Sequence, residues 1–271
     1  MREWDSHKQR VVTGILLAVP LIGILSLGPY WSWVLLVGAA SAVALWEFQG
    51  LVFQDGLPCR WQAFHALVGL LLLLGAATGD APGLHFALVA ALFASLFALL
   101  AFAPREASGL SRIGLLSLGW LYIPYLLSYV LLIGKIDGGR AWMFYIFTVT
   151  AAGDAGAFYC GRKFGRHKLY ELVSPKKTIE GSMGGLLSSI IVGALYGFLF
   201  LRPPSLWQLV FLTVCVALAG QIGDLIESMI KRMSGKKDSS QLLPGHGGLL
   251  DRLDSLLFVF PIIWMFILWM G

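Results

Sequence analysis

The chain has 271 residues, of which 58% are hydrophobic and only 13% are charged, and its formal net charge is +5. Water-soluble domains are about half apolar and about a quarter charged, so this composition excludes an ordinary soluble domain and makes a lipid bilayer the expected solvent. A basic chain also suits a nucleic-acid partner, but that reading depends on where the basic residues fall. The three cysteines, Cys59, Cys160 and Cys215, lie far apart, so we expect free thiols and neither a disulfide framework nor a zinc site.

Apolar runs recur along the whole chain. Crossing a hydrocarbon core of about 30 Å takes about 20 apolar residues in a helix, and an open sheet edge in lipid would leave backbone groups without hydrogen bonds. We therefore expect an all-α, polytopic integral membrane protein with about nine transmembrane helices. The predicted spans are residues 11–28, 31–53, 62–78, 84–103, 113–133, 142–160, 182–201, 206–230 and 253–270.

The first apolar run follows His7, Lys8, Gln9 and Arg10, an arrangement that superficially resembles a signal peptide. No small-residue cleavage site follows it and further spans succeed it at once, so we expect a membrane anchor. We expect residues 1–110 to hold the N-terminal transmembrane helices, about four of them, and residues 111–271 to form a C-terminal catalytic part with two cytoplasmic motif loops. No internal repeat is evident, which weakens the case for an inverted-repeat transporter.

Basic residues fall mostly on one side of the predicted spans. With the N-terminus in the cytoplasm, seventeen Lys and Arg residues lie inside and only Lys135, Arg140 and Arg202 lie outside. The positive-inside rule therefore predicts a cytoplasmic N-terminus and an outer C-terminus, in a bacterial inner membrane. The charge that suggested a nucleic acid is mostly this topology signal, and most of it lies in two polar segments, residues 161–180 and 231–252.

Carboxylates inside predicted spans are costly, roughly 2.5–3.5 kcal/mol each on insertion scales. The chain nevertheless carries Glu47, Asp154, Asp224 and Glu227 in such positions. At about 1.5 Å per residue, Asp224 lies about 27 Å from the outer end of its span, close to the cytoplasmic interface. Glu47 falls at a similar level, and Asp154 lies about two thirds of the way across. Acids from distant parts of the chain are therefore expected near one membrane level.

The acids are also paired along the last two helices. Asp224 and Glu227 are three residues apart and share a helix face, and Asp251 and Asp254 stand in the same relation at the start of the next helix. Carboxylates from two consecutive helices can converge on one or two hard cations, which prefer oxygen ligands. We therefore predict a metal site whose candidate ligands are Asp224, Asp251, Glu227 and Asp154.

A glycine-rich turn separates these two helices. Residues 243–248 read Leu-Pro-Gly-His-Gly-Gly, which predicts a tight turn with an exposed backbone that runs into a helix start. Free N–H groups and the helix dipole at such a start attract phosphate. The turn is therefore predicted to cradle an anion.

An earlier segment complements the turn. Residues 174–178 read Ser-Pro-Lys-Lys-Thr, in which Pro175 suits the first turn of a helix and Ser174 its cap. Two lysines beside a helix N-terminus describe a second phosphate site. Gly181 and Gly185, just beyond, form a small-xxx-small pair that favours close helix packing. Carboxylates, lysines and glycine turns at one interface indicate metal-assisted phosphoryl chemistry.

Several of these residues have a purely structural interpretation as well. Glu227 and Lys231 are four residues apart and can form an ordinary helix ion pair, and Asp254 can pair with Arg252 or cap the backbone. The lysine pairs can be topology markers or contacts to anionic lipids. For His246, a structural hydrogen bond explains its place in the turn as well as catalysis does. The sequence leaves these alternatives open.

Residues 228–254 closely resemble the signature of the phosphatidate cytidylyltransferases, also called CDP-diglyceride synthetases. The segment reads Ser-Met-Ile-Lys-Arg-Met-Ser-Gly-Lys-Lys-Asp-Ser-Ser-Gln-Leu-Leu-Pro-Gly-His-Gly-Gly-Leu-Leu-Asp-Arg-Leu-Asp, which is long and irregular. Upstream, residues 154–162 and 174–181 also look like that family. The resemblance covers the C-terminal half well, whereas the N-terminal spans match only in being membrane helices.

This resemblance implies transfer of CMP from CTP to phosphatidate, giving CDP-diacylglycerol and pyrophosphate in phospholipid biosynthesis. It also implies Mg²⁺, K⁺ as a second cation, a homodimer in membrane lipid and no nucleic-acid partner. Asp224 and Asp251 would bind the metal. The candidate catalytic residues are Asp224, Asp251, Lys237, Arg252 and His246, and the candidate substrate-binding residues are Ser174, Lys176, Lys177, Thr178, Lys231, Arg232, Gly247 and Gly248.

Two other functions compete with this one. A secondary transporter would place its acids at the midplane, whereas these acids crowd one interface. The second competitor is another membrane phosphotransferase, such as a polyprenol or dolichol kinase, but the sequence lacks both the Asp-Gly…Ala-Arg pattern of the CDP-alcohol phosphotransferases and a Walker A ending. Incorporation of labelled CTP into lipid, set against solute uptake, separates enzyme from transporter. The choice of nucleotide rests on the resemblance alone.

Overall fold

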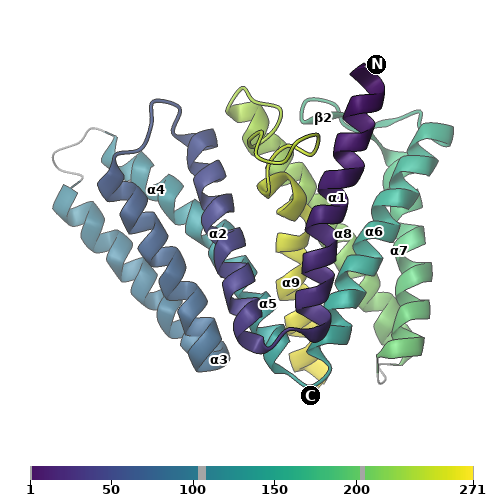
Figure 1. Ribbon diagram of the computed structural model, residues 1–271, viewed down its shortest axis with the longest axis horizontal. Helices are drawn as coiled ribbons and strands as arrows, with labels where there is room; N and C mark the ends of the chain where they lie inside the picture. The colour runs from purple at the N-terminus through teal and green to yellow at the C-terminus, as the bar shows by residue number, and fades with distance from the viewer. Residues whose placement is uncertain (1, 103–107, 202–204, 271) are drawn as a thin grey trace. The chain divides into compact units, whose positions relative to one another are not determined.

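The computed structural model describes residues 2–102, 108–201 and 205–270, with the side chains of all of these except residues 2–10 and 102. Arg105 and Arg202, which entered the charge count, and the last residue of the predicted span 84–103 lie outside the described residues. Helices run through nearly all of the described chain, as predicted (Figure 1). They are α1 (Arg2–Leu27), α2 (Tyr30–Val52), α3 (Cys59–Phe102), α4 (Gly109–Trp120), the π-helix η2 (Leu121–Tyr125), α5 (Leu126–Lys135), α6 (Gly139–Phe164), α7 (Ile179–Phe200), α8 (Leu206–Met233) and α9 (Leu250–Met270).

Residue contacts divide the chain into two compact units. Unit 1 comprises Met1–Lys135 and Asp238–Asp251, and unit 2 comprises Ile136–Lys237 and Arg252–Gly271. Each unit therefore combines segments that are distant in the sequence. The predicted division after residue 110 concerned function and stays a prediction.

Six helices in the described ranges are long and apolar enough to cross a membrane. They are Tyr30–Val52, Cys59–Ala101, Gly109–Lys135, Ile179–Phe200, Leu206–Met233 and Leu250–Met270. Each one overlaps at least one of the predicted spans. The predicted helices are therefore found where expected, but the predicted total of about nine spans is not reached.

Three features explain the difference in number. The predicted spans 62–78 and 84–103 both fall in α3, on either side of a break at Asp80, whose φ is 56°. The two parts of α3 on either side of this break pack against each other. Their backbones are so close that a Cβ added to Gly75 would lie 2.6 Å from the carbonyl oxygen of Gly83. The apolar part of α1, Val11–Leu27, is shorter than the other candidates. In α6, Asp154 and its neighbouring glycines lower the hydropathy of the predicted span 142–160.

A small antiparallel sheet is the departure from an all-α fold among the described residues. Strand β1 (Lys168–Tyr170) pairs with β2 (Ser174–Thr178), with Lys168 opposite Thr178. The prediction that Ser174 caps a helix beginning at Pro175 is wrong, because this stretch is the strand β2. The cap is Thr178, whose side-chain oxygen accepts a hydrogen bond from the backbone N–H of Gly181. The strand therefore leads directly into α7.

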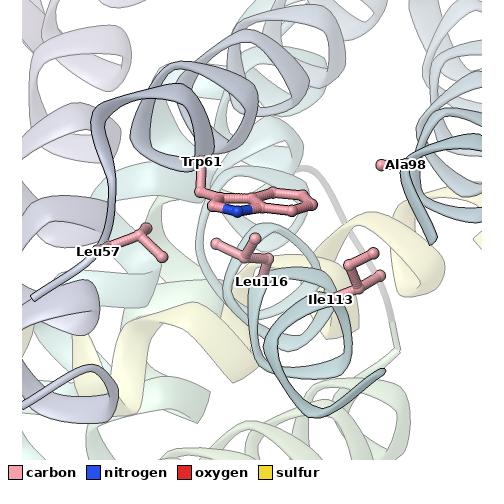
Figure 2. Close-up of a cluster of buried hydrophobic side chains, with 5 residues drawn as sticks. All are labelled: Leu57, Trp61, Ala98, Ile113 and Leu116. Atoms are coloured by element: carbon pink, nitrogen blue, oxygen red, sulfur yellow. The ribbon is translucent and has the colours of Figure 1, made fainter. Parts of the chain in front are cut away.

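Unit 1 packs α2, α3, α4 and α5 around an apolar core. Figure 2 shows one part of it, a cluster in which the indole of Trp61 lies among Leu57, Ala98, Ile113 and Leu116. Between α4 and α5 the helix loosens into η2, which contains Pro124. Proline has no N–H to donate, so a helix that continues through it commonly opens in this way.

Unit 2 contains an antiparallel pair of closely packed helices, α6 and α7, which lie side by side in Figure 1. The residues of α7 that face inward are small: Gly181, Gly185, Ser189, Gly193 and Gly197 are buried. A Cβ on Gly185 would lie 2.8 Å from the carbonyl oxygen of Gly153 in α6. The predicted small-xxx-small contact is confirmed, and it brings the backbones of α6 and α7 together.

We expect Gly185→Ala to lower the free energy of unfolding by about 1–3 kcal/mol, because the added methyl group forces α6 and α7 apart. The measurement is the thermal unfolding midpoint of the purified protein in detergent. Gly38→Ala in α2 is the matched control, because a Cβ there would meet nothing within 4 Å. Equal midpoints for the two variants would contradict the close packing of α6 on α7.

Candidate functional site

Unit 2 contains a cavity of about 630 Å³ bordered by α6, β2, α7 and α8, with Ser255 of α9. This volume is in the range of pockets that bind small molecules, about 300–1,000 Å³. About half of the residues that line it are apolar or glycine. Its charged lining residues are Asp154, Asp224, Arg162, Lys176 and Lys177. Carboxylates and cationic side chains therefore share one cavity.

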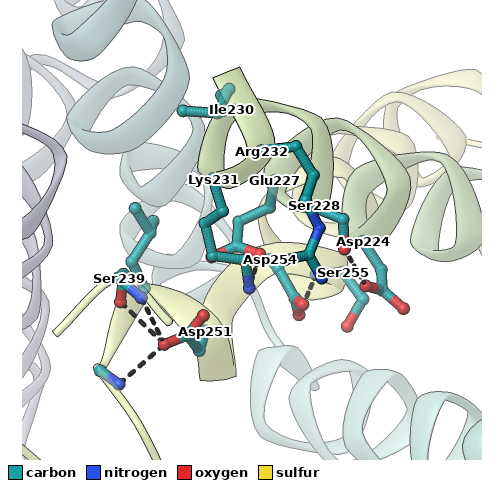
Figure 3. A network of polar contacts seen from close by, with 12 residues as sticks. Asp224, Glu227, Ser228, Ile230, Lys231, Arg232, Ser239, Asp251, Asp254 and Ser255 are labelled. Atoms are coloured by element: carbon teal, nitrogen blue, oxygen red, sulfur yellow. Dashed lines mark hydrogen bonds and ion pairs between the residues drawn. The ribbon is translucent and has the colours of Figure 1, made fainter. Parts of the chain in front are cut away.

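Asp224 is the acid of α8 in this cavity. Its carboxylate forms an ion pair with the Lys177 ammonium. The hydroxyl of Ser228 donates to its Oδ1 over 3.4 Å (Figure 3). The side chain keeps 36% of its exposure, so the carboxylate is accessible from the cavity. Gly223 places this turn of α8 directly against α9, because a Cβ there would lie 2.5 Å from the carbonyl oxygen of Asp254.

Five residues predicted from distant sequence segments meet in this cavity. Asp154 comes from α6, Lys176, Lys177 and Thr178 from β2, and Asp224 from α8. The sequence indicated their chemistry but could not show that they share one space. It also missed the other polar members of the lining, Thr150, Arg162, Ser182, Ser189, Gln221 and Ser255. Arg162 carried a signal, because it belongs to the segment 154–162 that resembles the family.

Some of the predicted site residues of unit 2 have other partners. Lys231 forms an ion pair with Glu227, one helical turn away, and Glu227 is fully buried. This is the structural alternative that the spacing allowed. The guanidinium of Arg232 donates to the carbonyl oxygen of Val173 over 3.4 Å. These residues and Ser174 are not among the residues that line the cavity.

The remaining predicted residues lie on or near the turn between α8 and α9. Lys237 and Arg252 have exposed side chains, and the ring of His246 lies close to Gly14 of α1. The backbone N–H of His246 donates to the carbonyl oxygen of Leu243 over 2.8 Å. The predicted tight turn is confirmed, since Leu243 and Gly247 also form a bridge across it.

Asp251, at the start of α9, is buried within unit 1. Its Oδ2 accepts hydrogen bonds from the N–H of Ser239 at 2.9 Å, the hydroxyl of Ser239 at 2.9 Å and the N–H of Gly248 at 2.8 Å. Figure 3 shows Ser239 and Asp251 joined in this way. Gly247 has a φ of 80°, a conformation in which glycine is preferred, and it brings the turn back onto Asp251.

Glu47 of α2 is an acid to which the sequence pattern assigns no role. It is 2% exposed, and its two oxygens accept hydrogen bonds from the hydroxyls of Ser239 and Ser240 and from the N–H groups of Leu249 and Leu250. The only signal in the sequence was the unfavourable free energy of placing an acid inside an apolar helix, which requires polar partners for the carboxylate.

These contacts correct the predicted anion cradle. The turn and the helix start do present N–H groups to anions, but the N–H groups of Gly248, Leu249 and Leu250 already donate to Asp251 and Glu47. The amides are therefore not free for phosphate, because the chain supplies its own carboxylates to them. Substrate binding by Gly247 and Gly248 stays a prediction.

The acids of the cavity fit a hard cation. Among the described residues, no group of three or more His, Cys, Asp and Glu side chains is arranged to hold a metal ion. Mg²⁺, however, commonly takes only one or two carboxylates and completes its shell with water and substrate phosphates. Asp224 and Asp154, which line a cavity that also carries lysines, are compatible with that mode of binding.

Comparison with known proteins gives consistent results. A profile described as the cytidylyltransferase family matches residues 8–270. A phosphatidate cytidylyltransferase of Bacillus subtilis is 31% identical over 267 residues, which cover 95% of this chain and 96% of that protein. Proteins of the same name from Staphylococcus haemolyticus and Staphylococcus aureus are 46% and 44% identical over 125 residues, 46% of this chain and 48% of each relative.

Proposed function

The chain belongs to the cytidylyltransferase family, and we propose that it transfers CMP from CTP to phosphatidate, giving CDP-diacylglycerol and pyrophosphate. It is a multi-pass membrane protein and a nucleotidyltransferase of phospholipid biosynthesis. The observation that carries the proposal is the cavity of unit 2, where two carboxylates and two lysines supply the groups that a phosphoryl transfer requires.

The reaction joins two anions, so neutralising charge is its main obstacle. An oxygen of the phosphatidate phosphate attacks the α-phosphorus of CTP, the bond from that phosphorus to the bridging oxygen breaks, and pyrophosphate leaves. The attacking phosphate is already ionised near neutral pH, so no proton has to be removed and His246 is not required as a base. We propose that Lys176 and Lys177 hold the nucleotide phosphates in the cavity, where they reduce this repulsion.

We propose Asp224 and Asp251 as the principal metal ligands, with Asp154 and Glu227 as further candidates. Support for Asp224 and Asp154 comes from their place in the cavity, whereas Glu227 pairs with Lys231. When bound, Mg²⁺ would neutralise part of the charge on the CTP phosphates. K⁺ as a second cation rests on the family resemblance alone.

The other proposed contacts are to the substrates. Thr178 lines the cavity beside the lysines and caps α7, which supports a role at the nucleotide. The remaining residues are proposed from the resemblance: Lys237 and Arg252 as catalytic groups, and Ser174, Lys231, Arg232, Gly247 and Gly248 as substrate contacts.

We also propose an orientation and an assembly. The excess of basic residues in the polar segments supports a cytoplasmic N-terminus and an outer C-terminus in a bacterial inner membrane. This orientation would let CTP reach the site from water and phosphatidate from the lipid. The homodimer follows from the resemblance.

Purified full-length protein in lipid nanodiscs should convert CTP and phosphatidate into CDP-diacylglycerol and pyrophosphate in equal amounts. The reaction should require Mg²⁺ and stop when EDTA is added. Labelled CTP followed into the lipid fraction measures it. Absence of lipid product, together with uptake of a solute by vesicles that contain the protein, would replace this function with transport.

Asp224→Asn and Asp251→Asn should each lower the rate by about 100-fold or more, because each removes a charge that faces the phosphates or their metal. The initial rate at saturating CTP measures the loss, and membrane extraction with gel filtration checks that the variants fold. Asp80→Asn is the control, because that acid pairs with Lys135 and has no proposed role at the site. Full activity of either variant would remove that residue from the metal site.

Fusions of alkaline phosphatase test the orientation. The enzyme is active only outside the cytoplasm, so a fusion after Gly271 should be active and one after Gly235, in the polar segment before α9, should be inactive. Green fluorescent protein at the same positions should give the opposite pattern. The reverse result at both positions would contradict the proposed topology.

A further inference from the structure

We infer that Glu47 is a positioning residue that fixes the turn between α8 and α9 and, through this turn, the carboxylate of Asp251. The inference rests on the proposed function in one respect, since it takes Asp251 to be a metal ligand. All of the groups involved belong to unit 1, although Glu47 lies in α2, almost two hundred residues before the turn.

Hydrogen bonds compensate the buried charge of Glu47. Glu47 is 2% exposed and lies in a helix that is apolar enough to cross a membrane. A carboxylate in such surroundings is stable only when its oxygens accept hydrogen bonds. Oε1 accepts from the Ser240 hydroxyl at 2.6 Å and the Leu249 N–H at 2.9 Å, and Oε2 accepts from the Leu250 N–H at 2.7 Å and the Ser239 hydroxyl at 3.1 Å.

The same contacts of Glu47 hold the N-terminus of α9. Leu250 is the first residue of α9, and the initial N–H groups of a helix have no partner within the helix. Glu47 accepts from two N–H groups at this end, where the helix dipole also favours a negative charge. It therefore caps α9 from another helix, a role usually taken by a residue just before the helix in sequence.

The Ser239 hydroxyl links Glu47 to Asp251. The Ser239 hydroxyl lies within hydrogen-bond distance of both carboxylates, 3.1 Å from Glu47 Oε2 and 2.9 Å from Asp251 Oδ2. The N–H groups of Ser239 and Gly248 donate to the same oxygen of Asp251. A side chain on Gly248 would collide with Ser239 and Glu47, so no space remains for one between Gly248 and these two residues. The two ends of the turn are thus fastened to one pair of acids.

These hydrogen bonds fix the orientation of the Asp251 carboxylate. Partners that hydrogen-bond to a metal-binding carboxylate fix its orientation, and their loss typically costs about 10–100-fold in metal affinity. Replacing Glu47 by glutamine keeps the size of the side chain but leaves one acceptor oxygen and adds an NH₂ group that faces donors. The turn should loosen, and Asp251 should lose its fixed position while remaining in the chain.

The test compares Glu47→Gln with wild type in two measurements. Binding of Mn²⁺, as a paramagnetic substitute for Mg²⁺, is followed by electron paramagnetic resonance without substrates. Hydrogen exchange is followed in peptides that cover residues 239–250. We expect the Mn²⁺ affinity to fall by about 10–100-fold and the amides of Leu249 and Leu250 to exchange faster. In the assay, the Mg²⁺ concentration for half-maximal rate should rise by a similar factor, while the KM for CTP at saturating Mg²⁺ changes less.

Two serine variants keep the inference testable if Glu47→Gln does not fold. Ser239→Ala removes the hydroxyl that contacts both acids, whereas Ser240→Ala removes one that contacts Glu47 but not Asp251. Ser239→Ala should weaken Mn²⁺ binding strongly and Ser240→Ala to a smaller extent, because Ser240 acts on Asp251 only through Glu47. Gln49→Met in α2 is a further control, because it removes a hydrogen bond to His65 near Glu47 without touching the turn. It should leave Mn²⁺ affinity unchanged.

The outcomes separate this inference from the proposed function. Faster exchange with unchanged Mn²⁺ affinity would make Glu47 a structural residue only and overturn the inference, as would wild-type behaviour in both measurements. Wild-type Mn²⁺ affinity in both Ser239→Ala and Ser240→Ala would also overturn it. If wild type produced no CDP-diacylglycerol, the proposed function would fall, while the exchange and Mn²⁺ measurements would still decide the role of Glu47.

Discussion

The structure depends on one constraint, which is that a carboxylate taken out of water must be given partners. Glu47 and Asp251 lie among apolar helices, and each is surrounded by N–H and hydroxyl donors. Glu227 is buried beside the ammonium of Lys231. The contacts of Glu47 and Asp251 fasten separate segments of the chain to one another, whereas the Glu227–Lys231 pair stays within one helix.

The acids differ in the kind of group that pairs with them: backbone N–H groups for Asp251 and a lysine side chain for Asp224. Asp251 is held by two backbone N–H groups and a serine hydroxyl of the same turn. Asp224 is paired with a flexible lysine side chain at a cavity wall, and both groups retain about a third of their exposure. This ion pair costs little to separate, because it is already partly hydrated. The protein therefore contains one acid with a fixed orientation and one whose partner is easily separated from it.

Backbone proximity is the second feature that shapes unit 2. Glycines on α7 allow it to approach α6 until backbone atoms of the two helices are in contact, and the cavity that holds Asp154 and Lys177 borders this contact. The charged side chains can therefore be positioned by a close-packed scaffold. Thr178 belongs both to the packed helices and to the cavity, since it ends β2, caps α7 and lines the cavity.

Local sequence patterns were sufficient to predict the helical class, the positions of most apolar helices, the costly acids and the family signature, because helix formation in lipid and unusual residue choices are local properties of the chain. The tertiary structure alone decided which groups became partners. Glu47 and Ser239 are 192 residues apart, and no local periodicity connects them. For the same reason the sequence left the N–H groups of the turn free for a phosphate, whereas folding had already given them to carboxylates. Thr178 rather than Ser174 caps α7 because pairing with β1 draws residues 174–178 into a strand.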